Sequence, residues 1–220
     1  MAGLFAFAFL VIAAIVALGG TGMALGGDRV RNRRLVRRGL RYRWTVRVAD
    51  VGDGCDVKLE GAAIPVDGGG LEAPFSARRC VAYELTLFDL DDGVRPMLLA
   101  REVVACPFLL RDGSGTAHIL PAPARIGIQP DKQWRYDPIR PTTARVAALL
   151  ARHGVGARAK GRTLLVCEGV LEVGAVVAVS GHATQEPDPT APALYRTAST
   201  RPLLTGSDSA PLLLAASSEI

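Results

Sequence analysis

The first part of the sequence is one uninterrupted apolar stretch. No charged side chain occurs in residues 1–27, and residues 4–18 are continuously apolar. A helix of about 20 apolar residues crosses the ~30 Å hydrocarbon layer of a membrane. A cleaved signal peptide, the alternative, would carry basic residues before its apolar core, and none precedes this one. The pattern therefore predicts a retained transmembrane anchor over residues 1–27.

Beyond the anchor, apolar residues occur in short runs or alternate with polar residues, and turn-forming residues separate the runs. Both patterns are typical of β-strands. A loop or ragged strand edge is predicted over 185–200, and the apolar run 210–216 is too short to cross a membrane. Strands are predicted over 43–50, 55–61, 80–89, 97–105, 107–112, 116–120, 124–128 and 163–183, the last with a turn near Glu172 to Gly174.

One helix is predicted among the strands. Val146, Leu149 and Leu150 have the spacing of one helical face, residues 141–142 favour the start of the helix, and Gly154 favours its end. Many short strands with a single surface helix favour a mainly β fold of the α+β type. The expected architecture is a partly closed barrel or a sandwich, similar to an OB fold.

A dense run of arginines comes after the anchor. Nine arginines occur in residues 29–47, and no basic residue precedes the apolar stretch. Because arginine-rich flanks stay in the cytoplasm, this asymmetry predicts an outside N-terminus and a cytoplasmic C-terminal domain, as in a bacterial inner-membrane protein. Cations near anionic lipid headgroups contribute on the order of 1 kcal/mol each. The juxtamembrane segment 28–47 is therefore predicted to lie on the bilayer through Arg29, Arg31, Arg33, Arg34, Arg37, Arg38, Arg41 and Arg43.

The charge of the whole chain does not predict nucleic-acid binding. The formal net charge is +5, but residues 48–220, the predicted folded domain, contain 17 basic and 20 acidic residues. A phosphate backbone is bound by a continuous basic surface, which this balance disfavours. The expected partners are the bilayer with its anionic headgroups, and a protein or small ligand whose identity the sequence leaves open.

The sequence contains no recognisable catalytic or metal-binding motif. Cys55, Cys80, Cys106 and Cys167 lack the paired short spacing of a zinc site, so no metal and no cofactor is expected. The segment 88–93 does not have the ligand spacing of a calcium loop, and no serine or cysteine lies in a hydrolase motif. We interpret the four cysteines as buried or unreactive thiols and the segment 88–93 as a hairpin turn.

Three segments in the C-terminal part form an ordered set of motifs. They are LEAPFSARRCVAYE at 71–84, PFLLRDGSGTAHILP at 107–121 and CEGVLEVGAVVAVSG at 167–181. Together they resemble the GIDE domain, also called the BAM or "beside a membrane" domain, over about residues 50–220. Most of the motif residues have structural explanations, with Phe108 in the core and the glycines at turns. The motif positions are Pro74, Cys80, Tyr83, Phe108, Asp112, Gly115, Glu168, Gly174 and Gly181.

The GIDE resemblance implies two functions. The family includes prokaryotic membrane proteins and the membrane domain of mitochondrial RING-type ubiquitin ligases, whose RING has closely paired cysteines and a histidine. No such set occurs in this sequence. The leading expectation is therefore a membrane-anchored, noncatalytic binding or scaffolding module. The alternative implied by the family is a ubiquitin-ligase-like transferase acting in organelle organisation.

Overall fold

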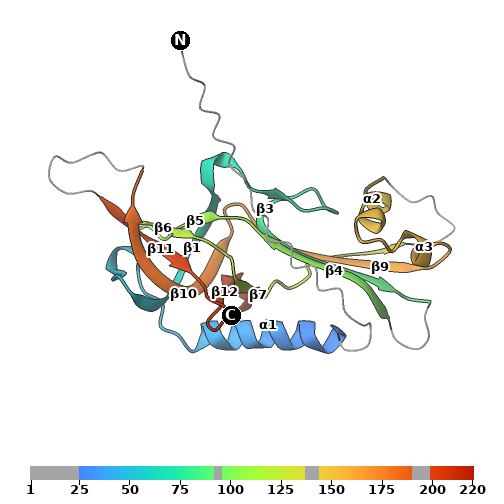
Figure 1. Ribbon diagram of the computed structural model, residues 1–220, viewed down its shortest axis with the longest axis horizontal. Helices are drawn as coiled ribbons and strands as arrows, with labels where there is room; N and C mark the ends of the chain where they lie inside the picture. Colours follow the sequence, from blue (N-terminus) through green and yellow to red (C-terminus); the bar gives the residue numbers. More distant parts are fainter. Residues whose placement is uncertain (1–24, 92–95, 137–143, 190–198) are drawn as a thin grey trace, which may run out of the picture.

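The computed structural model describes residues 25–91, 96–136, 144–189 and 199–220. Its strands form two β-sheets, one closed into a barrel and one open, and one long helix lies alongside them (Figure 1). The mainly β class predicted from the sequence is confirmed. Residues 1–24 of the predicted anchor lie outside the described residues. None of the helices in the described part has both the length and the apolar character needed to cross a bilayer.

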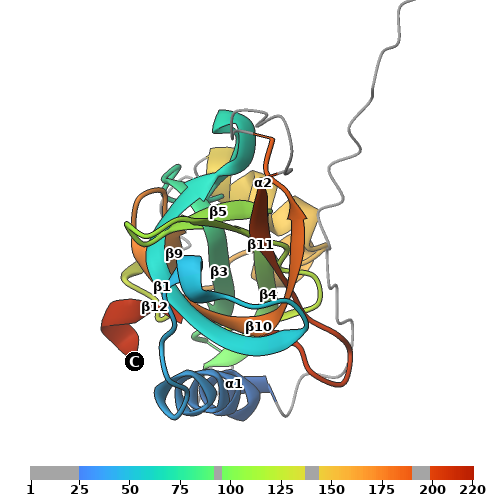
Figure 2. The same cartoon turned by 90° about the vertical axis from the view of Figure 1, so that its left-hand side faces the viewer.

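Five strands close the barrel. Strand β1 hydrogen-bonds to β5 on one side and to β10 on the other, so the sheet returns on itself (Figure 2). Closure hides the strand edges and surrounds a core that contains Phe108, Leu59 and Leu204. The barrel strands are β1 Cys55–Pro65, β5 Phe108–Arg111, β6 Thr116–Ile119, β11 Thr200–Thr205 and β10 Val176–Pro187. Two further strands extend it from β10, namely β12 Leu212–Ala216 and β7 Ala124–Ile126.

The second sheet is organised around a long central strand, β3, which pairs with neighbours on both sides. One face of the sheet packs against two helices, because Leu85 and Leu87 of β3 share a core with Val146 and Leu149. The strands are β2 Leu71–Glu72, β3 Arg79–Asp89, β4 Met97–Ala105, β8 Lys132–Tyr136 and β9 Leu164–Glu172. The helices are α2 Ala144–Arg152 and α3 Gly156–Ala159.

Helix α1, Leu25–Arg41, contains most of the arginine-rich segment. It runs beneath the junction of the barrel and the second sheet (Figure 1) and contacts β7, β10 and β12. The segment that was predicted to lie on a membrane is therefore also part of the folded domain. Short 3-10 turns occur at Val48–Asp50, Val66–Gly68 and Ser217–Glu219.

Several sequence predictions agree with the structure, and one strand does not. The helix predicted near residue 146 is α2, and Gly154 comes after it with φ +64°. The strand predicted over 43–50 is wrong, because this segment has only a single bridge at Thr45 and then a 3-10 turn. The reason is that the Val48 N–H donates to the Asp112 carboxylate rather than to a neighbouring strand. Strands β2, β8, β11 and β12 and helix α3 were not predicted.

Candidate functional site on helix α1

The inner face of α1 is fixed against the barrel extension. Val36 and Leu40 are fully buried and pack with Ala178 of β10 and Ala215 of β12. Gly39 allows close approach, since a Cβ there would lie 2.5 Å from a side-chain carbon of Leu213. Burial of two large aliphatic side chains contributes about 1.5–3 kcal/mol each. The helix is therefore held in one orientation about its axis.

Polar contacts add to this orientation. Arg37 donates to Gln129 Oε1 at 2.8 Å and to Glu219 Oε2 at 3.1 Å. The other oxygen of Glu219 accepts from the Gln129 backbone N–H at 3.1 Å. Asn32 donates to the Ile126 carbonyl. Arg37 is thus half-buried and committed to contacts within the protein.

The first arginine of the segment points into the protein. The Nε atom of Arg29 lies 2.7 Å from Glu84 Oε1, and the two side chains are 9% and 0% exposed. Arg101 of β4 donates to the same oxygen at 3.3 Å. Burial raises the pKa of the neighbouring Cys167, and Arg29 partly offsets that effect. The half-buried Arg33 lies close by, and burial together with the Arg29 charge lowers its pKa.

The outer face of α1 combines arginines with exposed apolar side chains. Val30 and Leu35 are each 44% exposed, and beyond the helix Tyr42 and Trp44 are 77% and 92% exposed. Side chains three and four residues apart lie on one side of a helix. The basic members of this surface, here called the outer face of α1, are the exposed Arg31, Arg34, Arg38 and Arg41, together with Arg43 just beyond the helix.

The apolar part of the outer face was missed by sequence analysis. Val30 lies four residues before Arg34 and Leu35 lies four residues after Arg31, so both fall on the arginine side of the helix, and this signal was available in the sequence. A basic helix face with aliphatic and aromatic side chains is typical of helices that lie at a membrane interface. The eight arginines predicted to lie on the bilayer therefore fall into two groups. Five remain on the outer face, while Arg29, Arg33 and Arg37 face the protein.

The motif residues of the barrel have structural roles. Phe108 is fully buried in the barrel core, as predicted. Asp112 organises the β5–β6 turn, because its Oδ1 accepts from Ser114 N at 2.8 Å and from Gly115 N at 3.1 Å. Its Oδ2 accepts from Val48 N at 2.8 Å. Gly115 lies where a Cβ would come within 3.1 Å of Val48.

Glu168 has a comparable role in the second sheet. It is fully buried on β9, and its two oxygens accept the backbone N–H groups of Phe75 and Ser76 at 2.8 and 3.0 Å. The turn after Pro74 is thereby attached to the sheet. The Phe75 ring packs on Trp134 of β8, with ring centroids 4.2 Å apart. Glu168 thus positions a loop, as Asp112 does in the barrel.

Cys80 and Tyr83 lie in the core of the second sheet. The Cys80 thiol is fully buried, and burial raises its pKa to about 12. The Tyr83 hydroxyl hydrogen-bonds to Glu102, and burial together with this contact raises its pKa. His153, at the end of α2, lies 3.0 Å from the other oxygen of Glu102. The thiol and the phenol therefore hold their neutral forms and form part of the packing between sheet and helix.

The two remaining motif glycines differ. Gly174 has φ +85° in the β9–β10 turn, which confirms the predicted need for positive φ. Gly181 does not have positive φ. It is required because a Cβ would lie 2.7 Å from the Thr205 carbonyl oxygen of the neighbouring strand.

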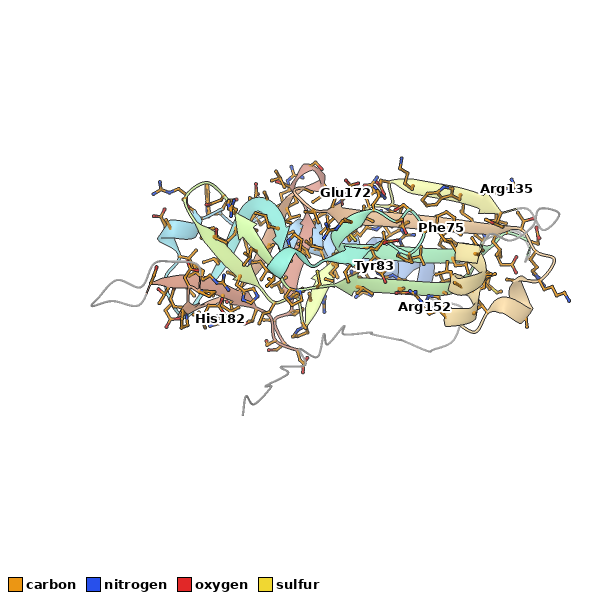
Figure 3. The ribbon with its side chains drawn as sticks, turned by 90° about the horizontal axis from the view of Figure 1, so that it is seen from above. Phe75, Tyr83, Arg135, Arg152, Glu172 and His182 are labelled. Atoms are coloured by element: carbon orange, nitrogen blue, oxygen red, sulfur yellow. The ribbon has the colours of Figure 1, made fainter. Side chains whose placement is uncertain are left out.

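The arrangement of ionisable groups does not assemble a reactive centre within the described ranges. No group of three or more His, Cys, Asp or Glu residues there could hold a metal ion. The four cysteines are free thiols. Glu168 binds backbone amides and Glu172 pairs with Arg78 at 2.9 Å, so the two do not form a catalytic carboxylate pair. Figure 3 labels Glu172 of β9, Tyr83 of β3 and Phe75 of the turn between β2 and β3.

The chain was compared with protein-family models, with curated proteins and with solved structures, and none of these comparisons returned a match.

Proposed function

We propose that this chain is a membrane-anchored, noncatalytic binding module that rests on an anionic bilayer surface through the outer face of α1. The observation that carries the proposal is the orientation of α1. Its inner face is packed on the barrel extension, and its outer face presents Arg31, Arg34, Arg38 and Arg41 together with Leu35. The domain would then be a binding or scaffolding unit of the GIDE type.

The outer face has the chemistry that a lipid surface recognises. Each arginine near anionic headgroups contributes on the order of 1 kcal/mol, and the exposed side chains of Leu35 and Trp44 can enter the interfacial layer. The same surface comes directly after the apolar stretch 1–27 in the sequence. A rigid α1 would therefore set the height and tilt of the whole domain above the membrane.

The noncatalytic part of the proposal rests on how the polar groups are used. Glu168 and Asp112, the motif carboxylates, hold backbone amides of loops. The Cys80 thiol is held protonated in the core. Reproducible turnover of a defined substrate by the purified chain would overturn this part.

Membrane contact can be tested through Trp44. The full chain would be reconstituted into nanodiscs of phosphatidylcholine with or without about 30% phosphatidylglycerol, in a Trp134→Phe background so that Trp44 is the fluorophore. Lipids brominated near the headgroup should quench its emission in the anionic discs. The double change Arg34→Gln with Arg38→Gln should remove most of the quenching, because it removes about 2 kcal/mol of attraction at low salt.

The matched control removes the same charge elsewhere. Arg111 and Arg135 are exposed on strands β5 and β8, outside α1, so changing both to Gln should leave quenching unchanged. Equal quenching in neutral and anionic discs, or equal losses in the two double variants, would contradict the proposal.

The proposed cytoplasmic orientation has a separate test. Cys55 is partly exposed, so a membrane-impermeant maleimide should label it only after spheroplasts are lysed if the domain is cytoplasmic. An Ala49→Cys variant provides an exposed thiol as a positive control. Labelling of either thiol in intact spheroplasts would place the domain outside.

A further inference from the structure

A second basic site lies on the barrel. A pocket of about 630 Å³ is formed by strand β10, the loop between β11 and β12, and the segment just after α1. Its polar lining includes Arg43, Asp56, Arg125, His182, Ser207 and Ser209. A volume of this size is typical of sites for small molecules. Figure 3 shows His182 in the barrel, at the opposite end of the molecule from Arg135 and Arg152.

The lining of the pocket has an excess of positive charge, with two arginines and one aspartate. Arg43 and Arg125 come from different parts of the chain, and neither forms an ion pair within the described residues. This distinguishes them from Arg29, Arg37 and Arg78, each of which lies within ion-pair distance of a carboxylate. The acidic residue of the lining, Asp56, lies 3.1 Å from His182 Nδ1. The two guanidinium groups therefore remain available to an anion.

The loop between β11 and β12 adds hydroxyl groups with fixed positions. Ser207 and Ala210 form a closed turn, because Ser207 N donates to Ala210 O at 2.9 Å and Ala210 N donates to Ser207 Oγ at 3.0 Å. The Oγ atoms of Ser207 and Ser209 lie 3.1 Å apart. Gly206 fixes the base of the loop, since a Cβ there would lie 2.3 Å from Leu212 N. The hydroxyls thus line the same pocket as the arginines.

The set of donors fits a phosphate group. Guanidinium groups bind phosphate oxygens with paired, charge-assisted hydrogen bonds, and the serine hydroxyl whose proton is not used between Ser207 and Ser209 supplies a further donor. The donors come from three separate parts of the chain, namely the segment after α1, strand β7 with Arg125, and the serine loop. A phosphate monoester offers three terminal oxygens to such a set, whereas a planar carboxylate offers two. The volume exceeds that of a phosphate ion and leaves space for an organic substituent.

We propose that this pocket binds a small phosphate monoester, either a soluble metabolite or the headgroup of a membrane lipid. The site shares only Arg43 with the outer face of α1, because Arg125 and the serine loop lie outside that helix. Arg43 belongs to the segment that connects the two surfaces. A bound phosphate would thus sit beside the end of the helix that contacts the bilayer.

Calorimetry with the full chain in nonionic detergent tests the site and identifies the source of the phosphate. Glycerol 3-phosphate represents a soluble ligand, and dihexanoyl phosphatidic acid presents the same phosphate on a lipid. We expect at least one to bind at physiological ionic strength. Binding of glycerol 3-phosphate would identify a soluble ligand, and binding of the lipid alone would identify a headgroup.

Variants show whether the pocket is responsible. Arg125→Gln and Arg43→Gln should each weaken binding at least tenfold, and Arg125→Lys should recover part of the affinity because it keeps the charge. Arg135→Gln, an exposed arginine at the other end, should bind as the unaltered chain does. No binding of either probe, or equal weakening by Arg125→Gln and Arg135→Gln, would overturn the proposal.

The two proposals can fail separately. Arg34→Gln with Arg38→Gln should remove most of the quenching of Trp44 in anionic nanodiscs while leaving the affinity for glycerol 3-phosphate unchanged. Arg125→Gln should weaken binding of glycerol 3-phosphate while leaving the quenching of Trp44 unchanged. A loss of phosphate binding in the α1 double variant would show that the outer face of α1, rather than the pocket, binds the anion.

Discussion

Arg29 of α1 and Glu84 of β3 form a buried ion pair, with Nε and Oε1 separated by 2.7 Å. Arg101 of β4 lies 3.3 Å from the same carboxylate oxygen. The pair joins the beginning of α1 to the second sheet, while Val36 and Leu40 join the rest of the helix to the barrel extension. One helix is therefore attached to both sheets.

Removing the charge of Glu84 should destabilise the domain strongly. In Glu84→Gln, Arg29 remains buried without an anionic partner, a loss that costs about 3–5 kcal/mol. Urea unfolding of the detergent-solubilised chain, monitored by circular dichroism, measures the change. Arg31→Gln, on the outer face of the same helix, should cost less than about 0.5 kcal/mol. A Glu84→Gln protein as stable as the unaltered chain would show that the pair does not attach the helix.

Glu168→Gln should release the turn after Pro74. The amide retains one acceptor oxygen, so one of the two charge-assisted hydrogen bonds from Phe75 N and Ser76 N is lost and the other weakens. We expect the free energy of unfolding to fall by about 2 kcal/mol. Because Phe75 packs on Trp134, emission of Trp134 should shift to longer wavelength in a Trp44→Phe background. Glu172→Gln, in which an exposed ion pair is lost, should leave the emission unchanged and cost less than about 1 kcal/mol.

Gly181→Ala should separate strands β10 and β11. The new Cβ would lie 2.7 Å from the Thr205 carbonyl oxygen, so the backbone must move, at a cost of about 1–3 kcal/mol. Gly156→Ala is the control, because no atom lies within 4 Å of its Cβ and its φ is not positive. Thermal unfolding of the two variants tests this, and equal melting temperatures would contradict the predicted clash.

Cys80 should be unreactive in the folded protein and should make stability depend on alkaline pH. Burial raises the pKa of its thiol from 9.0 to about 12. The neutral thiol is favoured by the fold, so its contribution is fully present below about pH 9 and is lost as the pH rises through about 12. The unfolding free energy should decline more steeply above about pH 9 in the unaltered chain than in Cys80→Ala. Rapid alkylation of Cys80 near neutral pH without denaturant would contradict its burial.

Asp112 should stabilise the chain at neutral pH and less so in acid. Burial by itself raises the pKa of this carboxyl, but hydrogen bonds from Val48, Ser114 and Gly115 outweigh burial and lower it below 3.8. A lowered folded-state pKa gives stability that is present above 3.8 and is lost as the pH falls through the folded value. Asp112→Asn should cost about 1–2 kcal/mol near pH 6, and the difference should shrink near pH 3. An unchanged difference in acid would contradict the pKa argument.

Local patterns were sufficient to predict much of the sheet structure. Alternation over 55–61 and 80–89 predicted β1 and β3, and the DGSG sequence predicted the β5–β6 turn at Gly113, which has φ +87°. Those features depend on side-chain alternation and on backbone angles that few residues adopt. Strand β8 was missed because Lys132–Tyr136 has little apolar alternation and forms by pairing with β9.

The sequence by itself determined the apolar N-terminal stretch, the arginine-rich segment beside it and the mainly β character of the C-terminal domain, because composition and periodicity are local properties. The tertiary structure decided which arginines remain exposed. Glu84 alternates with apolar residues and would face solvent in an isolated strand. In the folded protein Glu84 is buried, and Arg29 of α1 points inward to pair with it. The tertiary structure also decided that Arg43, Arg125 and two serines line one pocket, since strand pairing brings together residues that lie far apart in the sequence.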